Sequence, residues 1–341
     1  MPRFAIVFAL LCLFTAAAGA QVGETVTVER VLIDARVTIA NGEPIEGLTA
    51  GDFTVKIDGL PAKVESVTWI ADTEAARALA EVHQEAPRDG GDVAPAGRLF
   101  VLFVQTDFAR HTTRLGGAMK FMPYVKDLLE MFEPEDRVAV FSFDSHLKFR
   151  LDFTSDPDRV HEAVKASIMI DDPPPPPLVA NPSLARRLDR QEMKNAASSE
   201  ASLTIVANAL KPIPGPKTLI LLGWGLGSLS GGAVRMPREY AVAKQRLENA
   251  RVTIFSLDTS DADYHSLEVG LQAAAADTGG FYAKTHRFPQ LAVERLQRTL
   301  SGHYELEVRR PDAIARGTHA ISVTVKRRGA TVLARSTYVD E

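Results

Sequence analysis

The sequence contains a single cysteine among its 341 residues, and this residue, Cys12, lies in the first apolar segment. One thiol cannot close an internal disulfide, and it cannot build a metal site that needs several cysteine ligands. An excess of charge is also lacking, because 39 Lys and Arg residues stand against 43 Asp and Glu residues. From this near balance we do not expect the basic surface of a nucleic-acid-binding protein.

Short catalytic motifs are absent as well. His161-Glu162 is followed by lysine, not histidine, at position 165, so the zinc-protease motif does not occur. There is no Gly-x-Ser-x-Gly nucleophile elbow and no phosphate-binding P-loop. The segment Gly223–Gly227 has a GxGxG spacing, which is not that of a dinucleotide-binding loop. We therefore expect a protein that is not an enzyme, with a hydrolase site assembled from distant carboxylates as an alternative.

The first 20 residues have the pattern of a secretory signal peptide. Arg3 is their only charge, residues 4–14 are apolar, and small residues occupy positions 18–20. No later stretch approaches the roughly 18 apolar residues of a membrane-spanning helix. We expect cleavage near Ala20, which would leave a mature chain without cysteine in the periplasm or outside the cell.

Residues 21–70 have the features of a small antiparallel β unit. Residues 25–40 alternate β-branched and polar side chains, the period of a half-buried strand. Turn dipeptides follow at Asn41-Gly42 and Asp58-Gly59, and further strands are expected near 52–55 and 63–70. Residues 71–97 are expected to form a linker that starts with a short helix.

A different pattern occupies residues 98–302. Residues 98–104, RLFVLFV, are continuously apolar, as in a strand that is buried on both faces of a parallel sheet. Similar runs alternate with helical spacing, which predicts an α/β fold with a doubly wound, mostly parallel sheet. The expected strands are 98–104, 137–143, 147–153, 218–223, 252–258 and 280–284, and the expected helices are 114–133, 156–168, 183–210, 237–250, 265–277 and 288–301.

Two further segments complete the organisation. A proline-rich insertion at 171–182 contains five consecutive prolines, which impose extended polyproline geometry and predict a stiff surface loop or a docking ligand. Residues 303–341 return to a period of two, with strands expected at 304–308, 321–325 and 331–339, the last two joined by a hairpin-like turn at 326–329. We hypothesise that this C-terminal segment packs with residues 25–70, so that the α/β domain is inserted between them.

Several blocks resemble the von Willebrand factor A-related family of secreted acidobacterial proteins. They are VTIANGEPIEGLTAGDFTVKIDGLPAKVESV, RLFVLFVQTD, EDRVAVFSF, LDFTSDPDRVHEAV, AAADTGGFYAKT, SGHYELEVRRP and ARSTYV, and together they cover nearly the whole chain after residue 20. The resemblance implies a von Willebrand A-type, Rossmann-like domain that binds ligands. In such domains an Asp-x-Ser-x-Ser loop, a Thr and a further Asp hold Mg²⁺ or a similar ion at the C-terminal edge of the sheet, and the ion accepts an acidic residue of the partner.

This sequence departs from that metal-binding pattern. The first strand is followed by Gln105-Thr106-Asp107-Phe108-Ala109-Arg110-His111, which supplies two serines in neither possible register. Gly223-Trp224-Gly225 stands where relatives carry an acidic ligand, and Arg110 and Arg114 add positive charge. We therefore predict a degenerate adhesion site that uses no metal and no other cofactor. A metal-dependent module that uses Asp107 and Thr112 is the alternative; otherwise Asp107 is expected to cap the next helix.

The predicted ligand-binding edge combines three loops, at 105–113, 142–146 and 223–230. Its partner is expected to be a protein that the sequence does not identify. Trp224 is either an exposed anchor for this partner or a buried core residue. The candidate residues are Gln105, Thr106, Asp107, His111, Thr112, Thr113, Asp144, Trp224 and Ser228.

Overall fold

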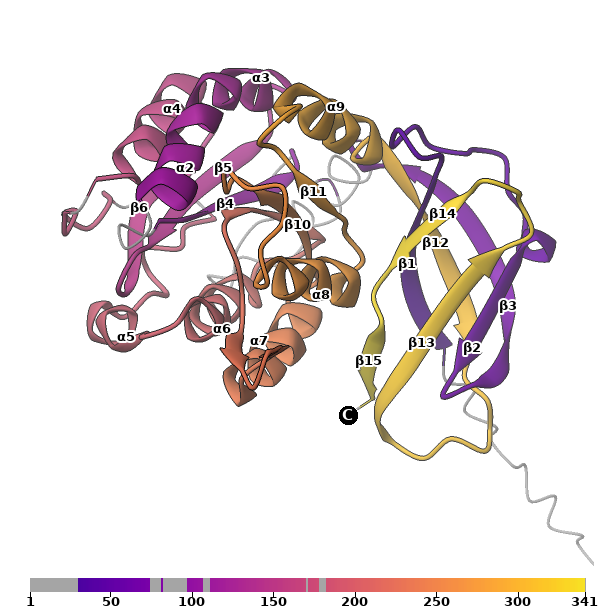
Figure 1. Cartoon of the computed structure of the whole chain (residues 1–341). Helices are drawn as coiled ribbons and strands as arrows, with labels where there is room; N and C mark the ends of the chain where they lie inside the picture. Colours follow the sequence, from indigo (N-terminus) through magenta and orange to yellow (C-terminus); the bar gives the residue numbers. More distant parts are fainter. Residues whose placement is uncertain are drawn as a thin grey trace, which may run out of the picture.

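A computed structural model describes residues 30–73, 81, 97–106, 111–169, 171–177 and 182–340 (Figure 1). The predicted signal peptide, most of the predicted linker and Asp107 lie outside these residues. The described chain forms a helix-covered sheet and, beside it, a second sheet without helical cover. Within the described ranges, no helix is both long and apolar enough to cross a membrane.

The first sheet has six strands in the order β11-β10-β7-β4-β5-β6. All neighbouring strands are parallel except β6, which runs antiparallel to β5. The continuous apolar runs predicted as strands are confirmed, and β4 and β7 are buried along their whole length. The strands are β4 (Leu99–Gln105), β5 (Arg137–Phe143), β6 (Leu147–Thr154), β7 (Lys217–Gly223), β10 (Val252–Asp258) and β11 (Tyr282–Lys284).

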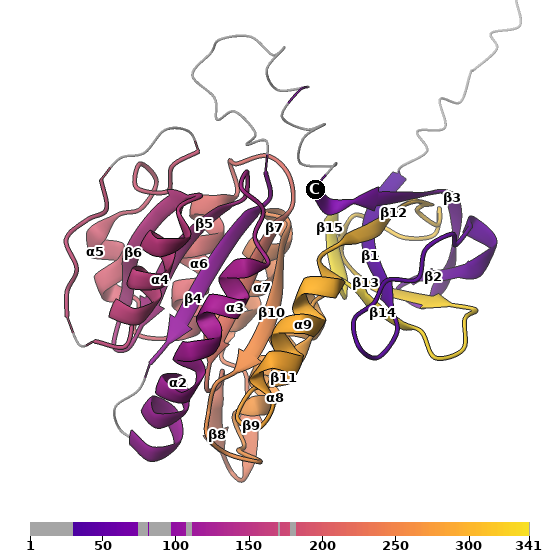
Figure 2. The same cartoon turned by 90° about the horizontal axis from the view of Figure 1, so that it is seen from above.

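Helices cover both faces of this sheet (Figure 2). Along β4, Val101 and Phe103 enter the core on one face, while Phe100 and Leu102 enter the core on the other. Each fully buried side chain of this size stabilises the fold by about 1.5–3 kcal/mol. One face is covered by α6 (Ser199–Leu210), α7 (Arg238–Asn249) and α8 (Glu268–Thr278), and the other by α2 (Gly116–Phe121), α3 (Val125–Glu130), α4 (Pro157–Ala166) and α9 (Pro289–Thr299).

Two expected helices are interrupted. The region 114–133 consists of a π-helical turn at His111–Leu115, then α2, a 3-10 turn at Met122–Tyr124, and α3. Pro123 has no amide hydrogen for a helical bond, so the α-helical bonding pattern is interrupted there. The region 183–210 contains a short α5 (Arg190–Asn195) and the separate α6, which begins where the Ser198 hydroxyl accepts a bond from the Ala201 amide.

The second sheet unites the two ends of the described chain. Its order is β14-β1-β12-β3-β2-β13-β15, so the strands of the N-terminal and C-terminal segments are interleaved in one sheet. The expected packing of these two segments is therefore confirmed. The strands are β1 (Arg30–Thr38), β2 (Phe53–Ile57), β3 (Leu60–Ala71), β12 (Gly302–Arg309), β13 (Gly317–Val325), β14 (Thr331–Ala334) and β15 (Thr337–Asp340), with a 3-10 turn at Ala50–Asp52.

Tyr304 fixes this second sheet from within. It is 1% exposed, and its ring lies edge-on to Phe53 and Trp69, with centroids at 5.3 and 5.0 Å. Its hydroxyl donates to the Ile45 carbonyl and accepts from the Leu48 amide. A side chain of the C-terminal segment thus organises the core and a loop of the N-terminal segment.

The hairpin expected around 326–329 forms only in part. After the turn the chain first joins the opposite edge, where β14 pairs with β1, and only β15 returns to pair with β13. The consecutive strands β14 and β15 therefore lie at the two opposite edges of the curled sheet (Figure 1). The prediction of one strand over 331–339 was wrong, because pairing with β1 divides it.

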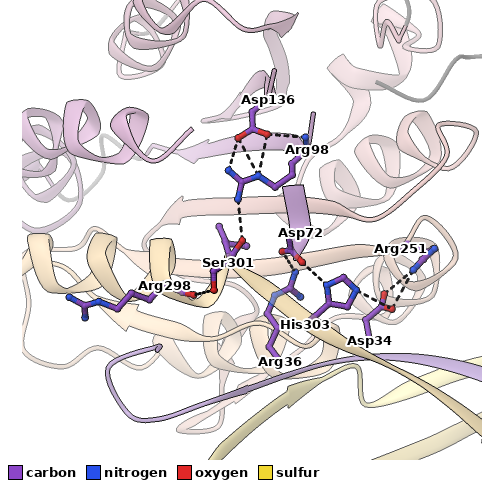
Figure 3. Close-up of polar contacts among 10 residues, drawn as sticks. Asp34, Arg36, Asp72, Arg98, Asp136, Arg251, Arg298, Ser301 and His303 are labelled. Carbon is purple, nitrogen blue, oxygen red and sulfur yellow. Dashed lines mark hydrogen bonds and ion pairs between the residues drawn. The ribbon is translucent and has the colours of Figure 1, made fainter. Parts of the chain in front are cut away.

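A network of charges joins the second sheet to the amino ends of the parallel strands (Figure 3). Arg36 donates to Asp72 at 2.9 Å, and the His303 Nδ1 lies 2.5 Å from the other Asp72 oxygen. The His303 Nε2 lies 3.8 Å from Asp34, which pairs with Arg251 at 3.0 Å. Burial alone would raise the pKa of Asp72, but Arg36 and His303 outweigh burial and hold that pKa below its ordinary value.

A second set of contacts extends this closed end (Figure 3). Asp136, 1% exposed, receives the Arg98 guanidinium, and Arg98 also donates to the Leu300 carbonyl at 3.1 Å. Lys217 is buried beside them and donates to the Ala250 carbonyl at 2.9 Å. Burial, with a smaller effect of the Arg251 charge, lowers the pKa of Lys217 to about 7.

Candidate functional site

The carboxyl ends of β4 and β7 are held together by Gln105. Its buried side-chain Nε2 donates to the Ser199 hydroxyl and to the Gly225 carbonyl, both at 2.7 Å. Its Oε1 accepts from the backbone amides of Trp224 and Gly225, at 3.0 and 3.2 Å. An amide side chain has two hydrogens to donate and two lone pairs, so this set of bonds uses all of its capacity.

Close approach explains the glycines of the segment 223–227. A Cβ atom added at Gly223 would lie 2.6 Å from the Gln105 Oε1, and one added at Gly225 would lie 2.4 Å from the Cβ of Leu267. Glu200 holds the same segment through the Gly227 amide, at 2.6 Å. These glycines therefore let the loop pack against its neighbours.

A cavity of about 240 Å³, which we call the edge pocket, opens beside this loop. At its rim the guanidinium carbon of Arg114 lies 3.4 Å from the centre of the Trp224 ring, a cation–π stack. Burial lowers the pKa of Arg114. Trp224 is half-buried, so neither of the two predicted alternatives describes it fully. The lining residues are Thr113, Arg114, Trp224, Leu229, Ser260, Ala262, Tyr264, His265, Ser266 and Leu267.

Behind the pocket, Asp258 ends β10 and is 1% exposed. It accepts bonds from Ser260, at 2.6 Å, and from Tyr282, at 2.7 Å, and lies 2.7 Å from the His265 Nε2. Burial acts to raise the pKa of Asp258, but these contacts outweigh it and lower the pKa. Asp258 therefore stays ionised and holds the loop that carries His265 at the pocket.

Asp258, His265 and Glu268 are the described residues best placed to share a metal ion, with ligand atoms within 4.8 Å of one another. Asp258 already accepts bonds from Tyr282 and Ser260, and the Lys284 ammonium lies 2.7 Å from the Glu268 Oε2, an oxygen with no hydrogen bond among the described residues. A metal ion would compete with this lysine for Glu268. The geometry is that of an ion-paired network that positions a loop.

The structure brings some of the predicted residues together and separates others. Thr113 and Trp224 line the edge pocket, and Gln105 supports it from below. Asp144 instead pairs with Lys148, away from the pocket lining. Thr106 is buried and its amide bonds to the Phe143 carbonyl, Thr112 is exposed, and Ser228 lies in a hairpin of β8 (Ser228–Ser230) and β9 (Ala233–Arg235). Asp107 and the side chain of His111 lie outside the described part of the chain.

Exposed apolar side chains occur at this edge and on two segments that ion pairs connect to it. Met119, Leu229, Tyr264 and Phe288 are between 57% and 69% exposed. Leu229 and Tyr264 line the pocket itself. An ion pair between Lys120 and Asp261 brings α2, which carries Met119, to the pocket loop, and an ion pair between Arg287 and Asp263 does the same for the segment with Phe288.

Sequence reasoning missed most of these surface residues, and it missed Asp258, His265 and Ser199. They lie on four separate segments, and no motif or spacing connects them before the chain is folded. The only local signal was the position of Asp258 at the end of an apolar strand, where binding residues of α/β sheets commonly lie.

No family model matches the sequence, and a search of curated proteins finds no match. Among solved structures the chain is similar to a von Willebrand factor type A protein from Catenulispora acidiphila, with 11% identity, a TM-score of 0.41, and coverage of 92% of this chain and 74% of that one. It is also similar to the conserved hypothetical protein BatB from Bacteroides thetaiotaomicron, with 12% identity, a TM-score of 0.40, and coverage of 60% and 98%.

The human COPII-coat protein Sec24c is another similar structure, with 13% identity and a TM-score of 0.39 over 75% of this chain. The chain spans only 45% of the length of that protein. Similarities of this size carry no functional argument, so the conclusions below rest on the strand order and the geometry of the edge.

Proposed function

We propose that this protein is a non-enzymatic binding module of the von Willebrand A type, which holds a protein partner at the carboxyl edge of its α/β sheet without a metal ion. The observation that carries this proposal is the exposure of the Leu229 and Tyr264 side chains in the lining of a pocket that contains Trp224. Methionine and aromatic residues are enriched in protein interfaces, and clustered apolar exposure marks binding surfaces.

The strand order supports this location. From the central pair β4 and β7, the chain extends outward through β5 and β6 on one side and through β10 and β11 on the other. We interpret this order as a doubly wound sheet, in which ligands bind outside the carboxyl ends where the order reverses. Gln105 and Trp224 lie at that point, at the ends of β4 and β7.

The bonding of Gln105 supports binding without a metal ion. Mg²⁺ and Ca²⁺ need several oxygen ligands with lone pairs that point at the ion. The Gln105 oxygen is occupied by two amides, and its nitrogen presents positive partial charge. The alternative with Asp107 and Thr112 as ligands would have to bind its ion beside the Arg114 guanidinium.

The hydrolase alternative receives less support. The carboxylates that lie together behind the edge pocket are Asp258 and Glu268, but Asp258 accepts bonds from Ser260 and Tyr282, and Glu268 is paired with Lys284. Both groups are therefore engaged by other side chains, which does not favour an acid and base pair. An extracytoplasmic location remains part of the proposal, through the signal-peptide pattern of residues 1–20.

Affinity capture from the extracytoplasmic fraction, with the purified protein as bait, tests the proposed surface. A double variant, Leu229→Ala with Tyr264→Ala, should lose the captured partner. Val242→Ala is the matched control, because Val242 is an exposed apolar residue on α7, which does not line the pocket. Equal capture by the double variant and the control would overturn the assignment of this edge.

A further inference from the structure

The proline-rich insertion is attached to the domain at its beginning. Asp171 pairs with Arg150 at 2.5 Å, and Asp172 pairs with Arg190 at 3.2 Å and with Lys194 at 3.1 Å. Arg150 lies on the edge strand β6, while Arg190 and Lys194 lie on α5. The five prolines therefore run across the space between β6 and α5, held there by two adjacent carboxylates.

Beneath this run lies a second cavity, of about 210 Å³, which we call the proline pocket. Its walls are mostly apolar. Phe149 is fixed in its wall by stacking on Phe141, with ring centroids 4.8 Å apart. The apolar lining residues are Leu147, Phe149, Pro173, Pro175, Pro176, Ala185, Leu188 and Met193.

The size and walls of the proline pocket suit one aromatic ring with a short substituent. An apolar cavity of about 150 Å³ is large enough for benzene in another protein. Proline rings in an extended run pack well against aromatic faces, which is how proline-rich segments and aromatic side chains recognise one another. Here the prolines and Phe149 belong to the same cavity, so a ring that enters it would contact both kinds of surface.

The charged side chains at the proline pocket determine which substituent on the aromatic ring would bind. Arg190 and Lys194 bring two positive charges to the single carboxylate of Asp172, whereas the charge of Lys148 is matched by Asp144. The site therefore has one surplus cation, which favours a small anion with oxygen acceptors.

We propose that the proline pocket binds a small aromatic carboxylate, with its ring between Phe149 and the prolines and its carboxylate at Arg190 and Lys194. This site is separate from the edge pocket, and it does not depend on the function proposed for that edge. Asp171 and Asp172 hold the proline run as the cover of the site.

Isothermal titration of the full chain with benzoate, benzamide and benzylamine tests the proposal. Benzoate should bind with one site per chain. Benzamide has the same shape without the charge, and it should bind about tenfold more weakly or worse. Benzylamine should give no measurable binding. Equal affinities for the three compounds, or the absence of benzoate binding, would overturn the proposal.

Two variants locate the site. Arg190→Gln should reduce benzoate affinity to that of benzamide, while Lys194 still pairs with Asp172 and retains the proline run. Met193 is a half-buried residue of the cavity lining, so the larger side chain of Met193→Trp should fill the cavity and abolish the binding of benzoate and benzamide. Lys165→Gln on α4 removes an exposed cation elsewhere and should change neither affinity. Circular dichroism melting checks that each variant folds, and benzoate binding that survives Met193→Trp would contradict this location.

Discussion

The two ends of the α/β sheet differ in how they use polar side chains. At the amino end, Arg98, Asp136, Lys217 and Arg251 are paired or buried against the second sheet. At the carboxyl end, a neutral Gln105 ties the loops together, and apolar side chains around it stay exposed. We therefore infer that the amino end contributes to the stability of the fold, whereas the carboxyl end leaves apolar side chains accessible to a partner.

This difference has an energetic consequence. Removing one partner of a buried ion pair leaves an uncompensated charge, which costs far more than the loss of a contact at the surface. Apolar side chains that are already exposed contribute little to folding, so they can change without loss of the fold. Substitutions at the amino end should therefore change stability, and substitutions at the carboxyl end should change binding.

Asp136→Ala should have the largest effect on stability. It removes the carboxylate that receives the Arg98 guanidinium and the backbone amides of Arg98 and Glu133. We expect the free energy of unfolding to fall by about 3–5 kcal/mol, measured by urea denaturation. Glu162→Ala, at an exposed site on α4, should stay within about 0.5 kcal/mol of the wild type. An equal effect of the two variants would contradict the contrast between the ends.

Lys217→Met should act in the opposite direction and stabilise the protein. The folded-state pKa of Lys217, about 7, lies below its ordinary value of 10.5, so between these values the unfolded chain holds a proton that the folded chain has lost. The contribution of Lys217 to stability therefore rises with pH across this range and is most unfavourable below pH 7. Replacement by methionine should add about 2–4 kcal/mol at pH 7 and remove this rise. Unchanged pH dependence would show that Lys217 is not buried as described.

Gln105→Ala should have an intermediate effect. It leaves the amides of Trp224 and Gly225 and the Gly225 carbonyl without their partner, which should cost about 1–3 kcal/mol. Hydrogen exchange should show faster exchange in residues 223–227, with the amino end unaffected. Uniform protection in the variant would mean that Gln105 does not hold this loop.

Acidification should produce a smaller change through Asp72. Because its folded-state pKa is held below the ordinary value of 3.8, its contribution is complete above that value and is lost as the pH falls below it. Between about pH 5 and about pH 3, the wild type should lose about 1 kcal/mol more than Asp72→Asn. If the free energy of unfolding fell equally with pH in the two proteins, Asp72 would not contribute to the loss of stability in acid.

The strands of the α/β sheet and the antiparallel segments could be predicted from the sequence, because apolar runs and two-residue alternation are local signals. Pro123 could also have predicted the break before α3. The division of 331–339 into β14 and β15 could not be predicted, since it depends on which strands lie across from it. Gln105 and Trp224 were found through their place after strands, whereas Tyr264 and His265 come to the pocket only in the folded chain.

We propose that the carboxyl edge binds its partner without a metal ion. Isothermal titration of the full chain with Mg²⁺, Mn²⁺ and Ca²⁺ measures this property, with Asp107→Ala and Thr112→Ala as companion variants. We expect no saturable binding of any of the three ions, and the same result for the wild type and both variants. Saturable binding that Asp107→Ala abolishes would contradict it and establish a metal-dependent adhesion site.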